Sequence, residues 1–317
     1  MAGLKRSLMV DLNGLVLPTP VMVAAGCAGT GRELGGLTDL HRLGGVVSRS
    51  VTLRPRKGTP TPRIAESPSG IVWSTGLQNP GIEVFLAEEL PRLARGGAPV
   101  FVSIAGSTME EFVRLTSLLQ GAPGMAAIET QISGPDDELG TAVLASRPDR
   151  AAEIVGAVAR MASVPVFAKL PPLLSELVQT AQSCVRAGAH GLTLVDAVPG
   201  LGVDASSLRP RLGSVAGWLS GPAIRPLALR AVYEVARELP DVPILGVGGV
   251  RTGDDAVEML LAGAWAVQMG TATLVDPAAP VGAAQGMLAY LKAKGLASPS
   301  DVRGRLRVPE HPPEAVE

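Results

Sequence analysis

The stretch Val242-Pro-Ile-Leu-Gly-Val-Gly-Gly249 continues as Val250-Arg-Thr-Gly-Asp-Asp-Ala-Val-Glu-Met-Leu-Leu-Ala-Gly-Ala264, and the two parts read as one strand–turn–helix unit. The nearly continuous apolar run before Gly248 is typical of a strand buried on both faces, as in a parallel sheet covered by helices. Apolar residues recur at helical spacing from Gly253 to Leu261. Gly263 can adopt a positive φ at the end of that helix and turn the chain back toward the next strand.

The same unit recurs along the chain, and its repetition predicts the architecture. The expected strands are Val21–Gly26, Gly44–Ser50, Ala98–Gly106, Met125–Ser133, Val164–Leu170, Gly191–Ala197, Val242–Gly249 and Ala266–Gly270. The expected helices are Arg32–Leu43, Ile82–Arg95, Met109–Gln120, Pro148–Ala162, Leu174–Ala187, Pro222–Leu239, Gly253–Leu261 and Pro280–Lys294. Eight such units in about 250 residues fit an α/β fold of the (β/α)8 TIM barrel type. An open doubly wound sheet is the alternative.

Two long segments interrupt the repeat. Ser50–Pro80 is polar and rich in proline and glycine, and Ala197–Leu219 follows the sixth expected strand. Long loops in compact domains are commonly functional, and active sites of barrels lie on the C-terminal face. We therefore expect Ser50–Pro80 to form part of a site there. The whole chain, residues 1–317, is expected to be one barrel domain, with the charged, proline-rich residues 298–317 as a peripheral tail.

Composition excludes several functional classes. The 317 residues carry 28 basic and 29 acidic side chains, so no basic field exists that could hold a nucleic acid. The two cysteines, Cys27 and Cys184, do not have metal-ligand spacing, so we expect neither a metal site nor a disulfide framework. No signal peptide or spanning segment is recognisable, which predicts a cytoplasmic protein without membrane contact.

Two glycine-containing loops follow the last two expected strands. They are Gly246-Val-Gly-Gly249 and Gln268-Met-Gly-Thr271. In barrels these positions commonly bind phosphate through backbone N–H groups, and glycine allows the backbone to approach a phosphate closely. A glycine pair can also be a plain tight turn, but two such loops at consecutive positions favour a phosphate site. Their spacing is neither a Rossmann fingerprint nor a Walker loop.

Further motifs are spread over nearly the whole chain. They are Ala24-Ala-Gly26, Ser50-Val-Thr52 with Pro62-Arg63, Gly76-Leu-Gln-Asn-Pro-Gly81, Val102-Ser-Ile-Ala-Gly106, Lys169-Leu-Pro-Pro172, Leu219-Ser-Gly-Pro-Ala-Ile-Arg-Pro-Leu-Ala-Leu229, Pro243–Ala264 and Val267-Gln-Met-Gly-Thr-Ala272. Together these motifs resemble the dihydroorotate dehydrogenase family, especially the catalytic chain of the two-subunit type in its class 1 branch. They run from about Val10 to Pro277.

The resemblance implies a flavoprotein with FMN lying across the barrel mouth. It also implies a homodimer, and it leaves open whether a second iron–sulfur/FAD subunit accepts the electrons. Lys169 would lie near the N1/O2 edge of the flavin, where its charge stabilises the reduced form. The positions that the resemblance assigns to the cofactor are Ala25, Gly26, Ser50, Gln131, Lys169, Ser220, Gly221, Gly248, Gly249, Gly270 and Thr271.

The substrate side departs from the family pattern. The family motif Asn-x-Ser-Cys-Pro-Asn supplies a cysteine base, and here the same stretch is Gln131-Ile-Ser-Gly-Pro-Asp136. Gly134 therefore stands at the base position, and glycine cannot accept a proton. Before Gly76-Leu77, Trp73 stands where the family has an asparagine that binds orotate. Arg49 stands where the family has a lysine, Asp196 where it has an asparagine, and Trp218 where it has a glycine. The substrate-binding positions are then Arg49, Trp73, Gly76, Leu77, Gln131, Asp136, Asp196 and Trp218.

Few side chains can replace the missing base. We expect the catalytic residues to be Asp136, Lys169 and Arg49, with Asp136 as the better base candidate and Arg49 holding a substrate carboxylate or the flavin edge. Asp137 lies beside it, and Ser133 is interpreted as forming a hydrogen bond to the backbone. Asp196 could instead form an ion pair with Arg49 or Lys169. His41, His190 and His311 have no catalytic context in the sequence. Cys27 follows the Ala-Ala-Gly turn near the flavin and is interpreted as a small buried thiol.

The altered pocket predicts an FMN-dependent oxidoreductase that exchanges a hydride between flavin N5 and a carbon of a small molecule other than dihydroorotate. Losing several amides that pair with a pyrimidine ring costs about 1–3 kcal/mol for each polar group left unpaired. A genuine dihydroorotate dehydrogenase with a displaced base is one alternative. A flavin-binding relative without catalysis is another.

Overall fold

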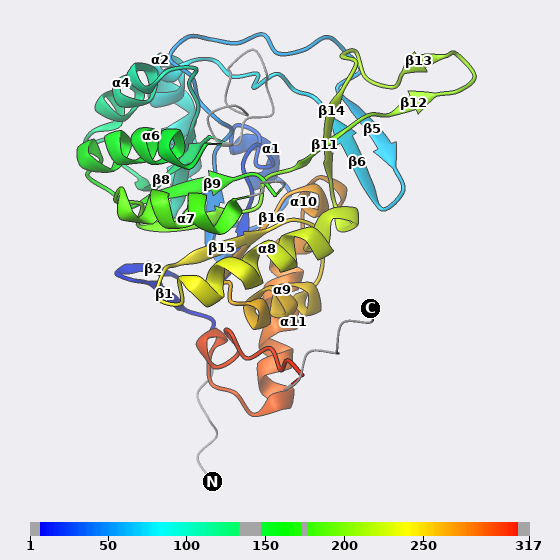
Figure 1. Ribbon diagram of the computed structural model, residues 1–317. Helices are drawn as coiled ribbons and strands as arrows, with labels where there is room; N and C mark the ends of the chain where they lie inside the picture. The colour runs from blue at the N-terminus through cyan, green and yellow to red at the C-terminus, as the bar shows by residue number, and fades with distance from the viewer. Residues whose placement is uncertain (1–6, 133–146, 173–175, 310–317) are drawn as a thin grey trace, which may run out of the picture.

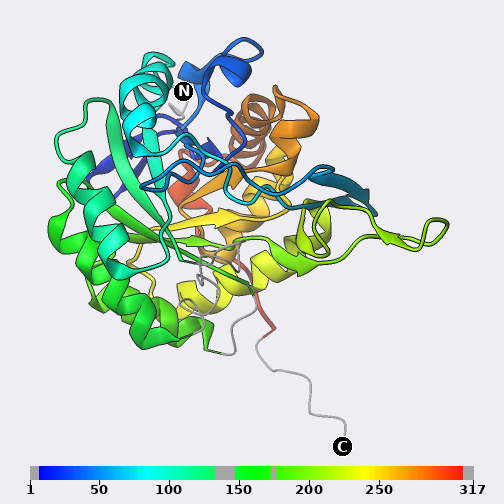
Figure 2. The same cartoon turned by 90° about the horizontal axis from the view of Figure 1, so that it is seen from above.

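A computed structural model describes residues 7–132, 147–172 and 176–309 of the chain. Eight parallel strands close into a barrel in which each pairs with the next in sequence and the last pairs with the first (Figures 1 and 2). All eight expected strands and the (β/α)8 barrel are confirmed. The strands are β3 (Val21–Val23), β4 (Gly45–Val47), β7 (Val100–Ile104), β8 (Met125–Gln131), β9 (Val166–Leu170), β10 (Gly191–Leu194), β15 (Ile244–Val247) and β16 (Ala266–Met269).

Helices surround the barrel, as Figure 2 shows from above. The longer ones are α4 (Met109–Leu119), α6 (Pro148–Met161), α7 (Leu177–Arg186), α8 (Arg225–Glu238), α9 (Gly253–Ala262) and α11 (Ala279–Lys294). Thr252 begins α9 with a capping box, in which its hydroxyl accepts from the N–H of Asp255 and the Asp255 carboxylate accepts in return. Gly263 ends this helix at φ +120°, in agreement with its expected role.

Three expected helices differ in detail. Pro222–Leu239 begins with a 3₁₀ turn, η4 (Pro222–Ile224), before α8. Arg32–Leu43 is divided into α1 (Arg32–Gly35) and a 3₁₀ turn, η1 (Leu40–Arg42), because Gly35 and Gly36 weaken the helix between them. Ile82–Arg95 is one helical segment formed by α2 (Ile82–Val84), a π-helical turn η2 (Phe85–Glu89) and α3 (Leu90–Arg95). A short helix, α10 (Thr271–Val275), follows β16 and was not expected.

The two long loops join into an antiparallel sheet over the C-terminal face of the barrel. Its strands are β5 (Ile64–Ser67), β6 (Gly70–Trp73), β11 (Val198–Gly200) and β14 (Gly217–Ser220), in the order β11-β14-β6-β5. Trp73 lies directly opposite Trp218 in the pairing of β6 with β14. The hairpin β12 (Val203–Asp204) and β13 (Arg209–Pro210) extends from this sheet away from the barrel (Figure 1).

The N-terminal end of the barrel is closed by segments from both ends of the chain. The hairpin β1 (Val10–Leu12) and β2 (Leu15–Leu17) buries Leu12 and Leu17 against the inner core of the barrel. Part of the segment expected to be a peripheral tail also packs there, because Val302 is 2% exposed and follows a 3₁₀ turn, η5 (Pro299–Asp301). The Arg303 guanidinium lies 3.5 Å from the centre of the Trp265 ring. In the described part of the chain, no helix is long and apolar enough to span a membrane.

Candidate functional site

A cavity of about 810 Å³ lies at the C-terminal ends of the barrel strands, beneath the antiparallel sheet. Its volume is in the range of pockets that hold small molecules and cofactors. Most of the positions proposed from the sequence line it. They are Ala25, Gly26, Arg49, Ser50, Trp73, Leu77, Gln131, Lys169, Asp196, Ser220, Gly221, Gly248, Gly249, Gly270 and Thr271.

Three expected positions have a different status. Gly76 adopts φ +61° in the turn before Leu77, and its role is to permit that turn, since it does not line the cavity. Trp218 does not line the cavity either, although the pairing of β14 with β6 puts it on the same face as Trp73. Asp136, together with Ser133, Gly134 and Asp137, lies outside the described residues.

The loop after β15 has the conformation that a close backbone approach requires. Gly248 has φ +124° and Gly249 has φ +74°, a region that residues with a side chain rarely adopt. A Cβ at Gly249 would also lie 2.6 Å from the Arg225 Cβ. The loop after β16 places Gly270 and Thr271 on the same cavity. The two glycine-containing loops therefore meet at one place, as a phosphate site requires.

Lys169 forms the charged floor of the cavity. Its Nζ lies 3.5 Å from Asp196 Oδ1 and 3.8 Å from Glu129 Oε1, and its side chain is 7% exposed. Burial by itself lowers the pKa of Lys169, but the carboxylates of Asp196 and Glu129 outweigh it, so the pKa lies above its ordinary value. Gln131 Nε2 donates to Asp196 Oδ2 at 2.7 Å. The lysine therefore carries a fixed positive charge at the cavity.

Glu129 is a site residue that the sequence did not reveal. It is fully buried on β8, and its Oε2 accepts hydrogen bonds from Thr193 Oγ1 and Gln268 Nε2, both at 3.0 Å. The signal that could have identified it is a carboxylate within the otherwise uncharged strand Met125–Gln131, because buried charges are rare unless they are paired.

Arg49 has a carboxylate partner from outside the barrel strands. Its Nε lies 3.5 Å from Glu89 Oε2 on the π-helical turn η2. Burial raises the pKa of Glu89, while the charge of Arg49 acts in the opposite direction. Arg49 and Lys169 were both expected as possible ion-pair partners of Asp196, and the structure places Lys169 beside it.

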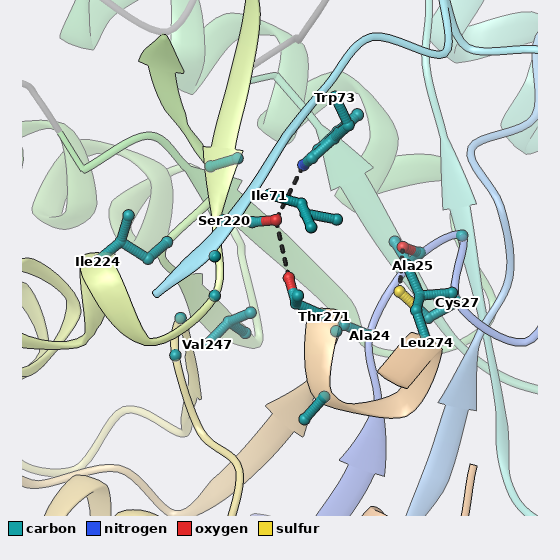
Figure 3. A pocket seen from close by; sticks show the side chains of 18 of the residues that line it. Ala24, Ala25, Cys27, Ile71, Trp73, Ser220, Ile224, Val247, Thr271 and Leu274 are labelled. Carbon is teal, nitrogen blue, oxygen red and sulfur yellow. Dashed lines mark hydrogen bonds between the residues drawn. The ribbon is translucent and has the colours of Figure 1, made fainter. Parts of the chain in front are cut away.

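Trp73 forms part of the cavity wall, and its indole points toward the phosphate-type loops. Its Nε1 donates to Ser220 Oγ at 3.0 Å, and Ser220 Oγ is 2.8 Å from Thr271 Oγ1 (Figure 3). The substrate-facing and cofactor-facing positions expected from the sequence are thus connected by hydrogen bonds.

Two further titratable side chains, Cys27 and His190, have surroundings that do not suit proton transfer to a substrate. Cys27 lines the cavity, and burial raises the pKa of its thiol to about 11, although Lys169 acts in the opposite direction. A neutral thiol of this kind is a poor base near neutral pH. His190 Nε2 lies 2.6 Å from the carbonyl oxygen of Leu12, at the other end of the barrel.

Comparison with known proteins gives a consistent result. The family model described as "Dihydroorotate dehydrogenase" matches residues 7–291. A protein of Geotalea daltonii, named "Dihydroorotate dehydrogenase B (NAD(+)), catalytic subunit", is 41% identical over 304 residues, which are 96% of this chain and 99% of the relative. Proteins of the same name from Pelobacter propionicus and Desulforudis audaxviator are 43% and 42% identical, over 96% and 95% of this chain and 99% and 98% of theirs.

Proposed function

The chain belongs to the dihydroorotate dehydrogenase family, and from this premise we propose that it is an FMN-dependent enzyme that oxidises dihydroorotate to orotate. The family establishes an oxidoreductase acting on CH–CH bonds and a flavoprotein barrel. The expectation of a different substrate is not supported, because the names of the relatives favour the alternative of a genuine dihydroorotate dehydrogenase. The single structural observation that carries the proposal is the cavity that joins the paired glycine loops to the buried Lys169.

The described residues fit FMN. The positive φ of Gly248 and Gly249 and the space beside Gly270 and Thr271 suit a phosphate group that is held by backbone and hydroxyl donors. Lys169 supplies a positive charge on the floor of the same cavity. The cavity is large enough for the cofactor to lie beside a small substrate.

When bound, FMN supplies a hydride acceptor at N5. The chain's own residues do the remaining work. Arg49 lines the cavity and suits the carboxylate of dihydroorotate, since a guanidinium matches a carboxylate in charge and shape. Lys169 keeps its proton, and its positive charge would stabilise the reduced form of the flavin. Asp136 accepts the proton from the neighbouring carbon as the C=C bond forms, in place of the side chain that Gly134 lacks.

A second candidate is a family enzyme for another small molecule with a CH–CH bond. Trp73 favours it, because an indole stands in the cavity wall where the family pattern has an asparagine that binds orotate. An aromatic wall suits a planar or more apolar ring than dihydroorotate.

We also propose that the enzyme works as a homodimer with a separate subunit that accepts its electrons. The names of its relatives specify catalytic subunits of NAD(+)-linked enzymes, which supports a partner of this kind. Light scattering of the purified chain tests the dimer, and purification with the products of neighbouring genes tests the partner subunit.

The experiment that tests the function is anaerobic mixing of the flavin-loaded protein with dihydroorotate. Loss of the oxidised flavin absorbance together with formation of orotate supports the leading proposal. Reduction by a different ring compound, with none by dihydroorotate, supports the second candidate.

A further inference from the structure

Three side chains from three distant parts of the sequence form a line of hydrogen bonds along the cavity wall. Trp73 on β6 donates from Nε1 to Ser220 Oγ at 3.0 Å, and Ser220 at the end of β14 lies 2.8 Å from Thr271 Oγ1 at the start of α10 (Figure 3). All three residues line the cavity, and all three are half-buried. The line connects the antiparallel sheet to the loop after β16.

Glycines at two positions allow this close approach. A Cβ on Gly70 would lie 2.2 Å from the carbonyl oxygen of Ser220, so the start of β6 can meet the end of β14 only without a side chain there. Gly221 has φ +103°, and a Cβ on it would lie 2.8 Å from Gly70 Cα and 3.5 Å from Thr271 Cγ2. The backbone is therefore shaped to bring the Ser220 hydroxyl between Trp73 and Thr271.

The chemistry of the indole fixes the direction of the first hydrogen bond in this line. An indole N–H can only donate, so Ser220 Oγ accepts from Trp73. Ser220 Oγ and Thr271 Oγ1 lie 2.8 Å apart, and either hydroxyl can be the donor in this second bond. If Ser220 donates to Thr271, the Trp73 N–H and the Ser220 O–H both have an acceptor, and accepting a hydrogen bond strengthens a hydroxyl as a donor. The Thr271 hydroxyl hydrogen then remains for a ligand in the cavity.

We propose that Trp73 is a positioning residue for the cofactor phosphate, which acts through Ser220 to orient the Thr271 hydroxyl as a phosphate donor. This inference rests on the proposed function, because it takes the phosphate of FMN as the ligand of Thr271. It changes the role expected for Trp73 from substrate recognition to cofactor binding. A phenylalanine at the same position would fill much of the same space without the N–H group.

The test compares FMN with riboflavin, which has the same ring system but no phosphate. Both dissociation constants are measured by fluorescence titration of flavin-free protein. We expect Trp73→Phe to weaken FMN binding about three- to tenfold, the range of one hydrogen bond, and to leave riboflavin binding unchanged. Trp265→Phe is the control at the opposite, N-terminal end of the barrel, and it should change neither constant, because Trp265 does not line the cavity.

Ser220→Ala provides a second route to the same answer. It should weaken FMN relative to riboflavin at least as much as Trp73→Phe, and the double variant should show no further loss, because both changes break one line of hydrogen bonds. If Trp73→Phe does not fold, as judged by circular dichroism, Ser220→Ala alone decides the FMN-to-riboflavin comparison.

Equal weakening of FMN and riboflavin, or unchanged FMN binding in both variants, overturns the inference. A wild-type protein that binds neither flavin overturns the proposed function instead, so the two failures are distinguishable.

Discussion

Lys169 Nζ lies 3.5 Å from Asp196 Oδ1 in a buried ion pair on the floor of the cavity. Glu129 Oε1 is 3.8 Å from the same ammonium group, so Lys169 forms ion pairs with two carboxylates. Desolvated charges of this kind depend on each other, because a charge that loses its partner in the interior keeps its full desolvation cost. Removing the lysine therefore affects stability as well as chemistry.

We predict that Lys169→Met lowers the free energy of unfolding by about 3–5 kcal/mol, because two buried carboxylates lose this cation. Guanidinium denaturation at neutral pH measures the change. Lys292→Met, on the exposed side of α11, is the matched control and should change stability by less than about 0.5 kcal/mol. Equal free energies of unfolding for the two variants would show that the ion pairs of Lys169 with Asp196 and Glu129 do not stabilise the fold.

The pH dependence of this effect has a definite sign. The pKa of Lys169 is raised above its ordinary value of 10.5, so its contribution to stability is fully present below that pH. The contribution is lost as the pH rises through the higher pKa of the folded state. The difference in unfolding free energy between wild type and Lys169→Met should therefore stay constant from about pH 7 to pH 10 and shrink only above that. A difference that already declines near pH 8 would indicate a lowered pKa.

The loop after β15 gives a prediction that concerns the backbone. Gly249→Ala should lower stability by about 1–2 kcal/mol and weaken FMN binding, because φ is +74° and the new Cβ would lie 2.6 Å from Arg225 Cβ. Gly282→Ala, in an exposed part of α11 where a Cβ meets nothing within 4 Å, should instead stabilise by about 0.5–1 kcal/mol. Thermal unfolding and flavin titration of both variants measure these effects. Wild-type FMN affinity in Gly249→Ala would argue against the phosphate role of this loop.

Asp136 is the proposed proton acceptor. Asp136→Asn should slow flavin reduction by dihydroorotate about 10²–10⁴-fold, the usual contribution of a general base, with FMN affinity unchanged. Asp137→Asn is the neighbouring control and should keep the wild-type rate. Rapid reduction in Asp136→Asn, measured by stopped-flow absorbance, would assign proton transfer to another group.

The barrel could be predicted from the sequence because each of its strands carries a local signal. Strands such as Ile244–Val247 are buried on both faces, so they appear as short apolar runs between glycine turns. The sheet over the cavity could not be predicted in the same way. Its strands β6 and β14 are short, and their pairing joins Trp73 to Trp218 across most of the barrel sequence. Short apolar segments carry no information about so distant a partner.

The geometry of the candidate site could be predicted where backbone requirements appear in the sequence. Gly248 and Gly249 have the positive φ values that a close approach requires, and Lys169 has Asp196 beside it. Glu129 was missed because its partners, Thr193 and Gln268, come from other strands and meet it only inside the closed barrel. Trp218 does not line the cavity although its partner Trp73 does, and only the folded structure reveals this difference.

The central claim is that the protein binds FMN in this cavity and oxidises dihydroorotate there. The most direct test is anaerobic stopped-flow mixing of the flavin-loaded protein with excess dihydroorotate, followed at the oxidised flavin band, with the orotate formed measured against the flavin reduced. The account predicts that the band disappears and that one orotate forms for each flavin. A flavin that remains oxidised with dihydroorotate, yet is reduced by dithionite, would contradict it.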